Sequence, residues 1–357
     1  MEKINFYNID KEEKIAIFQA IAAAKGMSSF AVEKDWWVSR TLEVIFQMEI
    51  AKHMVFKGGT SLSKAWKLIH RFSEDIDLAI DKEFFLKPQK EWSKKEITNV
   101  RKQAGVYVAG EFFDNLKVGF EARGVKDLKF SIVEVKDSDQ DPRIIEIFYP
   151  NVIAKPSEYM LPRVQVEIGC RALHEPCSMI TFGSLVDEVY IDKNFAEPLF
   201  SIPTVNAERT FLEKLFLLHE EFHRPVDKRR VDRLSRHLYD IYYLERSGIA
   251  DRAIKDKDLY ETIVAHRSKF NHVGGVNYNS HNPITLDPMP PSEIIGEWEY
   301  DYAKMMEDMI YEEHKPTFED LIQNIKDLKV KLQSLEWQFT LSFSTEETLP
   351  RFFAITR

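Results

Sequence analysis

Two aspartates, Asp75 and Asp77, stand two positions apart inside the apolar run DIDLAI, and this pattern constrains the fold most. The run predicts a β-strand, in which successive side chains point to opposite faces of the sheet. Both carboxylates therefore share one face, while Ile76 and Leu78 point to the other. Like charges so close together repel each other unless a positive group lies between them. The strand predicts a cation on its acidic face.

A glycine pair precedes this strand. The segment HMVFKGGTS (53–61) predicts a short strand that enters a Gly58–Gly59 turn, and LSKAWKLIH (62–70) predicts a helix after it. Glycine lets the backbone approach a ligand closely, and a helix that follows aims its first N–H groups outward. Such a turn can hold phosphates, although a Gly-Gly turn into a helix is more often structural. The groups available for phosphate are Gly58, Gly59, Thr60, Ser61, Ser63, Lys57 and Lys64.

A phosphate-binding turn followed by an Asp-x-Asp strand supplies both halves of a metal–triphosphate site. Mg²⁺ binds carboxylate and phosphate oxygens together, and it would relieve the repulsion between Asp75 and Asp77. Glu167, in the alternating run RVQVEIGC, points away from the apolar layer and can join them if the two strands are neighbours. Three carboxylates around two metal ions can activate a hydroxyl and stabilise a leaving pyrophosphate. The alternative is a set of solvated strand residues.

The remaining pattern predicts an α/β N-terminal half and a helical C-terminal half. Helices are expected at 11–24, from Ser28 or Ser29 onward, and at 91–122. Alternating segments at 128–135, 143–152 and 163–170 indicate a mixed sheet with one covered face. We therefore expect an α/β domain at 1–200, a helical domain at 201–340, and a tail at 341–357 to which no structure is assigned.

Composition, charge and the motifs present argue against several classes of function. A net charge of −9 argues against bulk, non-specific binding to nucleic acid, although the segment KRRVDRLSRH (228–237) is a local basic patch. That patch could contact RNA phosphates or be an ordinary solvated helix face. Neither cysteine has partners at metal-binding spacing, and no zinc-hydrolase, Walker A or nucleophile-elbow pattern occurs. The N-terminus has no apolar leader segment and no long apolar run follows, so a cytoplasmic protein without a membrane span is expected.

The chain resembles a known family at several segments in the expected order. The segment 58–80, GGTSLSKAWKLIHRFSEDIDLAI, is similar to the first motif of the AbiEii/AbiGii-type nucleotidyltransferase toxins, within the DNA polymerase β-like nucleotidyltransferase superfamily. The spacing from Gly59 to Asp75 is longer than is usual in the superfamily, but it is similar to the long spacing in this family. The other similar segments are VEKDWWVSRTL (32–42), VEI at Glu167, ERTFLEKLFLLHE (208–220), RHLYDIYYL (236–244) and EYDYAKMMEDMI (299–310).

The resemblance implies an α+β fold, with a polymerase β-like mixed sheet flanked by helices and a C-terminal helical domain. It implies that Asp75 and Asp77 bind the catalytic Mg²⁺, or Mn²⁺, with Glu167 as third ligand or base. The turn residues Gly58, Gly59, Thr60, Ser61 and Lys64 would hold the triphosphate. Lys214 would neutralise phosphate charge, and Asp240 would pair with Lys214 or contact the nucleotide. Lys214 in a helix and Asp240 among tyrosines could also be structural.

The function expected from the resemblance is Mg²⁺-dependent transfer of a nucleoside monophosphate from an NTP to the hydroxyl of an RNA, for example a tRNA, or of a protein. It also implies a toxin of a bacterial toxin–antitoxin or phage-defence system, with a cognate antitoxin as partner. Two alternatives stay open: a metal-dependent phosphodiesterase or nuclease, and a non-catalytic NTP-binding module. A nuclease needs no triphosphate turn, and a module would be expected to have lost one of the three carboxylates.

Overall fold

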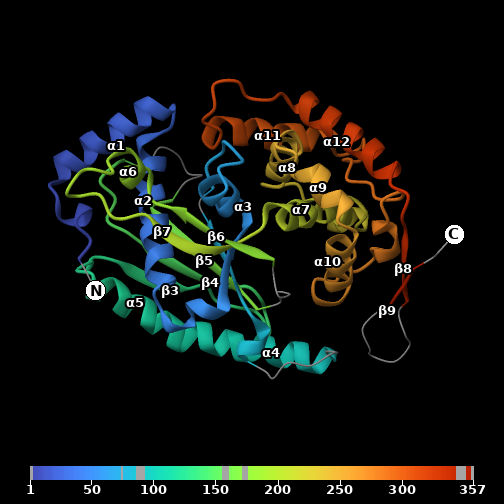
Figure 1. Cartoon of the computed structure of the whole chain (residues 1–357), viewed down its shortest axis with the longest axis horizontal. Coiled ribbons are helices and arrows are strands. Elements are labelled where there is room, and N and C mark those ends of the chain that lie inside the picture. Colours follow the sequence, from blue (N-terminus) through green and yellow to red (C-terminus); the bar gives the residue numbers. More distant parts are fainter. Residues whose placement is uncertain are drawn as a thin grey trace. The chain divides into compact units, whose positions relative to one another are not determined.

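A computed structural model describes residues 3–73, 75–85, 93–154, 161–170, 176–342 and 351–354 (Figure 1). The chain forms two compact units, each described by itself below. The first consists of Met1–Pro88, Thr98–Val205 and Tyr311–Glu313. The second consists of Gln89–Ile97, Asn206–Ile310 and His314–Arg357.

The first unit is built around a seven-stranded sheet with the order β3-β4-β5-β2-β1-β7-β6. Strand β2 runs antiparallel to β1 and parallel to β5, and β1 runs parallel to β7, so the predicted mixed sheet is confirmed. The other neighbours are antiparallel. The strands are β1 (Met54–Lys57), β2 (Asp75–Ile80), β3 (Lys129–Ile132), β4 (Arg143–Phe148), β5 (Arg163–Gly169), β6 (Cys177–Phe182) and β7 (Phe200–Val205).

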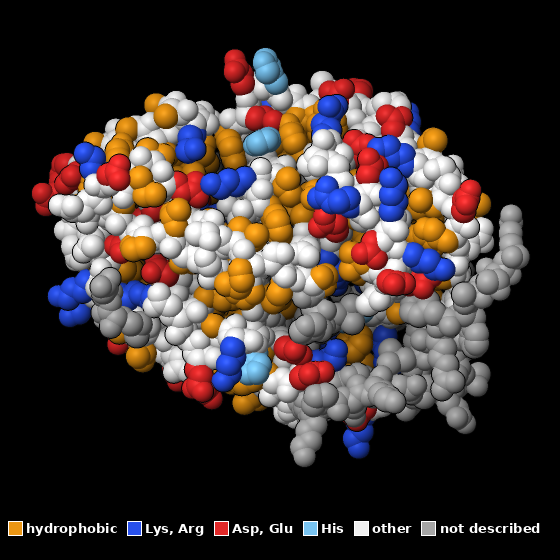
Figure 2. Space-filling view, in the orientation of Figure 1, with side chains coloured by type: hydrophobic (Ala, Val, Ile, Leu, Met, Phe, Trp, Pro, Cys, Tyr) orange, Lys and Arg blue, Asp and Glu red, His pale blue; other side chains and the backbone are white. Residues whose placement is uncertain are grey.

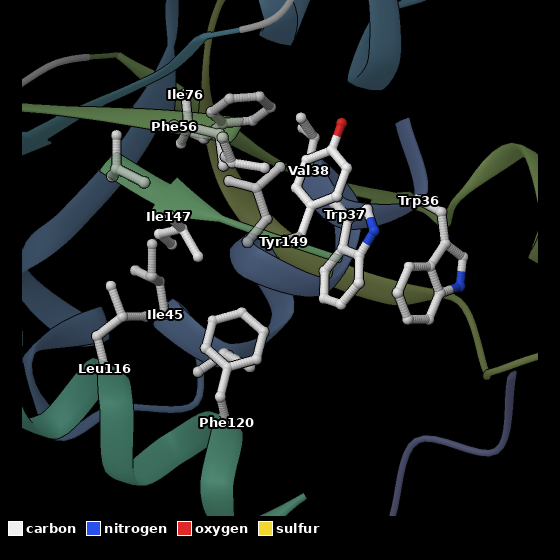
Figure 3. Packing of buried hydrophobic residues seen from close by; sticks show 14 of the residues in the cluster. Trp36, Trp37, Val38, Ile45, Phe56, Ile76, Leu116, Phe120, Ile147 and Tyr149 are labelled. Carbon is white, nitrogen blue, oxygen red and sulfur yellow. The ribbon is translucent and has the colours of Figure 1, made fainter. Parts of the chain in front are cut away.

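Helices cover the apolar face of this sheet. Their apolar side chains form one buried cluster with the strand residues that alternate with the acidic ones, such as Ile76 and Val166 (Figure 3). Helices α4 and α5 are joined by a π-helical turn, Val108–Phe112, so the long helix predicted at 91–122 is confirmed from residue 94 onward. The helices are α1 (Lys11–Lys25), α2 (Ser29–Ile45), α4 (Lys94–Tyr107), α5 (Phe113–Ala122) and α6 (Leu185–Val189).

Helix α2 begins where the sequence predicts. The Ser28 hydroxyl accepts the Ala31 N–H at 3.1 Å, which satisfies one of the N–H groups that every helix start leaves without a partner. Trp36 and Trp37 on this helix are buried in the core. Trp37 stacks on Tyr149, with ring centroids 5.1 Å apart (Figure 3).

Two features of the first unit differ from the sequence-based expectation. The helix expected at 62–70 instead begins at the glycine pair, as α3 (Gly58–Thr60), continues as a π-helix and ends at Ala65. The backbone then turns through a positive φ of 54° at Lys67. Strands β6 and β7 were not predicted, and the proline in β7, Pro203, pairs in register with Met179 of β6.

The second unit is helical, as predicted. Gly248, two residues after the end of α8, has a positive φ of 75°. Its helices are α7 (Ala207–Phe222), α8 (Arg236–Arg246), α9 (Ile249–Lys255), α10 (Lys257–Phe270), α11 (Ile295–Asp308) and α12 (Phe318–Gln333). The segment at 341–357, to which no structure was assigned, contributes to a two-stranded hairpin of β8 (Phe339–Ser342) and β9 (Arg351–Ala354). Residues 343–350 and 355–357 lie outside the described part.

Within the described residues, no single helix is long and apolar enough to cross a membrane. Helices α1 and α2 reach that length and apolarity only when they are counted together across a bend of 107°.

Candidate active site

The predicted carboxylates lie on neighbouring strands in the middle of the sheet. The parallel register of β2 and β5 pairs Asp77 with Glu167 and Asp75 with Gln165, so the condition on which Glu167 could join the two aspartates is met. Residues in register share a face of the sheet, which places all three carboxylates on one face. They are partly exposed, whereas Ile76 and Val166 on the other face are fully buried.

This donor set fits a hard divalent cation by its chemistry. It consists of carboxylate oxygens from Asp75, Asp77 and Glu167, the ligand type that Mg²⁺ prefers. Among the described residues, however, no three His, Cys, Asp or Glu side chains converge closely enough to form a ready metal cage. One Glu167 oxygen instead accepts the side-chain amide of Gln165 at 2.9 Å. The sheet thus fixes the three residues beside one another, and the ligand roles stay predictions.

Gly58 lies directly against the acidic strand. Its φ is +79°, and a Cβ built on it would lie only 1.9 Å from the Asp77 carboxylate oxygen. Any side chain at this position would therefore both strain the backbone and occupy the space of the Asp77 carboxylate. The glycine lets the turn lie directly against the Asp77 carboxylate. The close approach of this turn to a ligand stays a prediction.

Gly58→Ala is expected to lower the free energy of unfolding by at least about 2 kcal/mol, because positive φ and the clash with Asp77 act together. Urea denaturation of the full chain measures this. The matched control is Gly296→Ala in α11, where an added Cβ has nothing within 4 Å and a helical alanine is favourable. An unfolding midpoint for Gly58→Ala equal to that of the control would contradict this account of the turn.

Two residues that sequence reasoning did not select lie against the second glycine. A Cβ on Gly59 would meet Arg71 Nη2 at 2.8 Å and Ser73 Oγ at 3.0 Å. Arg71 is only 2% exposed, and its Nη1 donates to the Phe72 carbonyl at 3.2 Å. The signal for both was present in the sequence, because RFSEDID places them just before Asp75. A buried arginine beside the turn adds positive charge where the phosphates are expected.

The other predicted phosphate contacts have protein partners of their own. The buried Thr60 hydroxyl donates to the Asp75 carbonyl at 2.5 Å, and the fully buried Ser61 hydroxyl donates to the Gly58 carbonyl at 2.8 Å. Lys64 Nζ forms an ion pair with the Asp35 carboxylate at 2.5 Å. These three side chains stabilise the turn from inside, and their roles as phosphate ligands stay predictions.

Lys214 and Asp240 form an ion pair in the second unit. Lys214 Nζ, on α7, lies 2.8 Å from the Asp240 carboxylate on α8. Lys214 is 7% exposed and Asp240 is fully buried. The pairing that the sequence analysis offered for Asp240 is confirmed. A buried carboxylate needs such a partner, because burial disfavours its charged form.

A second buried network holds helix α7 in place. Arg267 donates to both carboxylate oxygens of Glu220, at 2.8 Å and 2.5 Å. Burial opposes the charge on Glu220, but this ion pair lowers the pKa of its carboxyl to about 2. His219 is also buried, with Nδ1 accepting the Asp287 N–H at 2.9 Å and Nε2 2.8 Å from the Ser280 hydroxyl. Burial and the neighbouring His281 lower the pKa of His219 to about 2.

The protein is therefore expected to lose stability as the pH falls from about 6.5 toward 2. In this window the unfolded chain binds a proton at His219 that the folded chain does not, so protonation stabilises the unfolded state. Above pH 6.5 His219 is neutral in both states, and the two states no longer differ in bound protons. Glu220 adds to the loss below its ordinary pKa of 4.5. Calorimetric melting at pH 7.5 and 5.5 measures the effect. His219→Gln should flatten the pH dependence between these values, whereas His314→Gln, at an exposed histidine, should not.

The comparison with protein families decides the identity. The family described as "Nucleotidyl transferase AbiEii toxin, Type IV TA system" has a sequence pattern that matches residues 40–324. The chain belongs to this family. The match covers the glycine turn, the strands of the three carboxylates and the Lys214–Asp240 pair. The protein is thus a nucleotidyltransferase of the AbiEii toxin family, which confirms the resemblance drawn from its motifs.

The solved structures that the chain matches include two bacterial proteins. The nucleotidyltransferase toxin MenT4 of Mycobacterium tuberculosis is 16% identical, with a TM-score of 0.46, over 92% of this chain and all of that one. JHP933 of Helicobacter pylori is 15% identical, with a TM-score of 0.39, over 82% of this chain and 91% of that one. No curated protein sequence matches the chain.

Proposed function

We propose that this AbiEii-family protein transfers a nucleoside monophosphate from an NTP to the hydroxyl of an RNA, with Mg²⁺ as cofactor and pyrophosphate as second product. The register that places Asp77 beside Glu167, with Gly58 against the Asp77 carboxylate, is the observation that carries the proposal. Carboxylates and a glycine turn in contact suit a substrate that bears both a metal ion and phosphates.

Each residue then has a defined task. Asp75 and Asp77 hold the cation, which supplies charge stabilisation at the reacting phosphate and at the leaving oxygen when bound. Glu167 acts as a further ligand or takes the proton from the acceptor hydroxyl. The backbone N–H groups at Gly58 and Gly59 orient the triphosphate, with Arg71 adding positive charge beside them. Lys214 is expected to neutralise phosphate charge as a point cation.

The RNA acceptor, a tRNA in particular, is the finer part of the proposal. Acidic and basic side chains are interspersed over the face shown in Figure 2, in keeping with the net charge of −9. RNA binding therefore depends on a local cationic segment rather than on an overall basic surface. The segment 228–237 suits this role in part: Lys228 is exposed, while Arg230 pairs with Glu221 at 2.7 Å. A cognate antitoxin is the second expected partner.

The test is to incubate the full chain with Mg²⁺, each α-labelled NTP in turn, and total cellular RNA or the protein itself. Label in RNA, dependent on one NTP and on Mg²⁺, supports the proposal, and label in protein alone moves the acceptor to a protein hydroxyl. RNA that becomes shorter without label favours the nuclease. If NTP binds but is not turned over in any mixture, the result favours the non-catalytic NTP-binding module.

A further inference from the structure

The open face of the sheet carries an exposed aromatic side chain beyond the three carboxylates. Phe148, the last residue of β4, is 38% exposed. Its neighbours in the chain, Ile147 and Tyr149, lie in the buried cluster (Figure 3), so Phe148 points to the other face of the sheet. The register of β4, β5 and β2 makes this the face that carries the three carboxylates. The aromatic ring therefore belongs to the surface that continues from the candidate active site.

Two cationic residues flank Phe148 in register on the same face. Lys129 on β3 lies opposite it on one side, and Arg163 on β5 lies opposite it on the other. Side chains in such positions have Cβ atoms about 5 Å apart. The Arg163 guanidinium pairs with Glu146, so the exposed Lys129 is the cation that can meet a ligand. An exposed ring beside a cation suits single-stranded nucleic acid, whose bases stack on aromatic rings and whose phosphates attract cations.

The position of Phe148 across the sheet is the side from which an acceptor would approach. The strand order β4-β5-β2-β1 places the acidic strand β2 between Phe148, on β4, and the glycine turn, which follows β1. In phosphoryl transfer the attacking oxygen and the leaving oxygen lie roughly in line, on opposite sides of the phosphorus. With the leaving pyrophosphate held at the turn beside β1, the acceptor hydroxyl must come from the side of β5 and β4.

The distance from Phe148 to the acidic strand suits a short stretch of single strand. Phe148 is in register with Arg163, and Asp75 is in register with Gln165, two residues farther along β5. Strands about 4.8 Å apart and a rise of about 3.3 Å per residue set the Cα atoms of Phe148 and Asp75 roughly 12 Å apart. At about 3.4 Å for each stacked nucleotide, a few nucleotides span this distance.

We propose that Phe148 and Lys129 bind the single-stranded end of the RNA acceptor. One unpaired base stacks on the Phe148 ring, and a neighbouring phosphate lies against the Lys129 ammonium. This inference rests on the proposed function for its RNA acceptor, and it adds where that acceptor lies and that its reacting end is unpaired. A base within a duplex is already stacked and paired, so it cannot lie flat on the ring.

Binding is measured without catalysis. A short fluorescent single-stranded RNA is titrated into the full chain in EDTA and without NTP, so neither metal nor transfer contributes. Phe148→Ala should weaken binding by about tenfold, which equals ~1.4 kcal/mol, and Phe148→Tyr should retain most of it because the ring is kept. The matched control is Phe84→Ala, in the short helix Lys82–Phe84 after β2. Phe84 has the same exposed fraction, 37%, and its loss should leave RNA binding unchanged.

Salt dependence tests the lysine. Each phosphate that a cation neutralises on a single strand contributes about 0.7 to the slope of log K against log salt concentration. Lys129→Gln should therefore reduce the magnitude of this slope by about 0.7. Lys11→Gln, at an exposed position of α1, should not change it.

Photocross-linking locates the RNA independently of these variants. A single strand that carries iodouracil, which reacts with an aromatic ring stacked on it, should cross-link to the peptide that contains Phe148. The inference is overturned if no single-stranded RNA binds, if duplex RNA of the same sequence binds as tightly, if Phe148→Ala and Phe84→Ala have equal effects, or if the cross-links lie only outside β3, β4 and β5.

The same variants separate this inference from the proposed function. RNA binding that depends on Phe148, with no label transferred to RNA in the presence of NTP and Mg²⁺, would count against the proposed function alone. Transfer of label to RNA with a KM for RNA that Phe148→Ala leaves unchanged would overturn this inference alone. When both hold, Phe148→Ala should raise the KM for RNA by about the tenfold loss in binding and leave kcat within a few-fold of wild type.

Discussion

Asp75→Asn is expected to lower the rate of nucleotidyl transfer by at least about a thousandfold, because the amide cannot supply the negative charge that holds Mg²⁺ against the triphosphate. The fold should survive the change. Asp75 lies on the partly exposed face of β2, while the apolar face that anchors the strand, with Ile76 and Leu78, is untouched. We expect the free energy of unfolding to change by no more than about 1 kcal/mol, because asparagine is close to aspartate in size and the side chain is partly exposed. Single-turnover transfer and urea denaturation measure the two quantities.

Glu146→Gln is the matched control for this variant. Glu146 is a carboxylate on the same face of the sheet, on β4, in register with Gln165. Its partners are protein groups: it pairs with Arg163 and accepts the Ser131 hydroxyl at 3.0 Å. The rate of transfer should therefore stay within a few-fold of wild type, and the free energy of unfolding should fall by about 1 kcal/mol or less. If Asp75→Asn and Glu146→Gln reduced transfer equally, the acidic pair would have no special role as a metal-binding set.

Local chemistry allowed most of the first unit to be predicted. The alternation of apolar and polar residues predicted which side chains of β2 and β5 belong to the apolar face, and the serine pair Ser28–Ser29 predicted the start of α2. The pairing of β2 with β5 could be stated only as a condition, since register depends on contacts between residues far apart in sequence. A single sequence holds no information on such contacts beyond pattern, so the alignment of Asp77 with Glu167 needed the structure.

The missed elements have identifiable physical causes. Strand β7 contains Pro203, which lacks an N–H and argues against a strand within a sheet, yet its neighbour β6 pairs along its whole length. The helix of the turn ends earlier than predicted because the backbone turns at Lys67, which has a positive φ. Lysine rarely adopts a positive φ, so the residue type at this position did not indicate the turn. Arg71 was passed over because a lone arginine says nothing about burial. Its position against Gly59 is a tertiary fact.

Lys214→Met is expected to lower the free energy of unfolding by about 3–5 kcal/mol, because it leaves the fully buried Asp240 carboxylate without its ion-pair partner at 2.8 Å. Methionine keeps the apolar stem of the lysine, so lost packing contributes little. Denaturation of the full chain measures the loss. Arg252→Met, which breaks an exposed pair with Glu208, provides the comparison and should cost about 1 kcal/mol or less.

The double variant Lys214→Met/Asp240→Asn separates stability from chemistry. Neutralising Asp240 removes the uncompensated charge, so most of the stability lost in the single variant should return. If Lys214 acts on phosphate, transfer must stay at least about a hundredfold below wild type in this refolded variant, because the cation is still missing. Recovery of transfer together with stability would show that the pair only joins α7 to α8. The buried ion pair alone fits both outcomes, and the double variant decides between them.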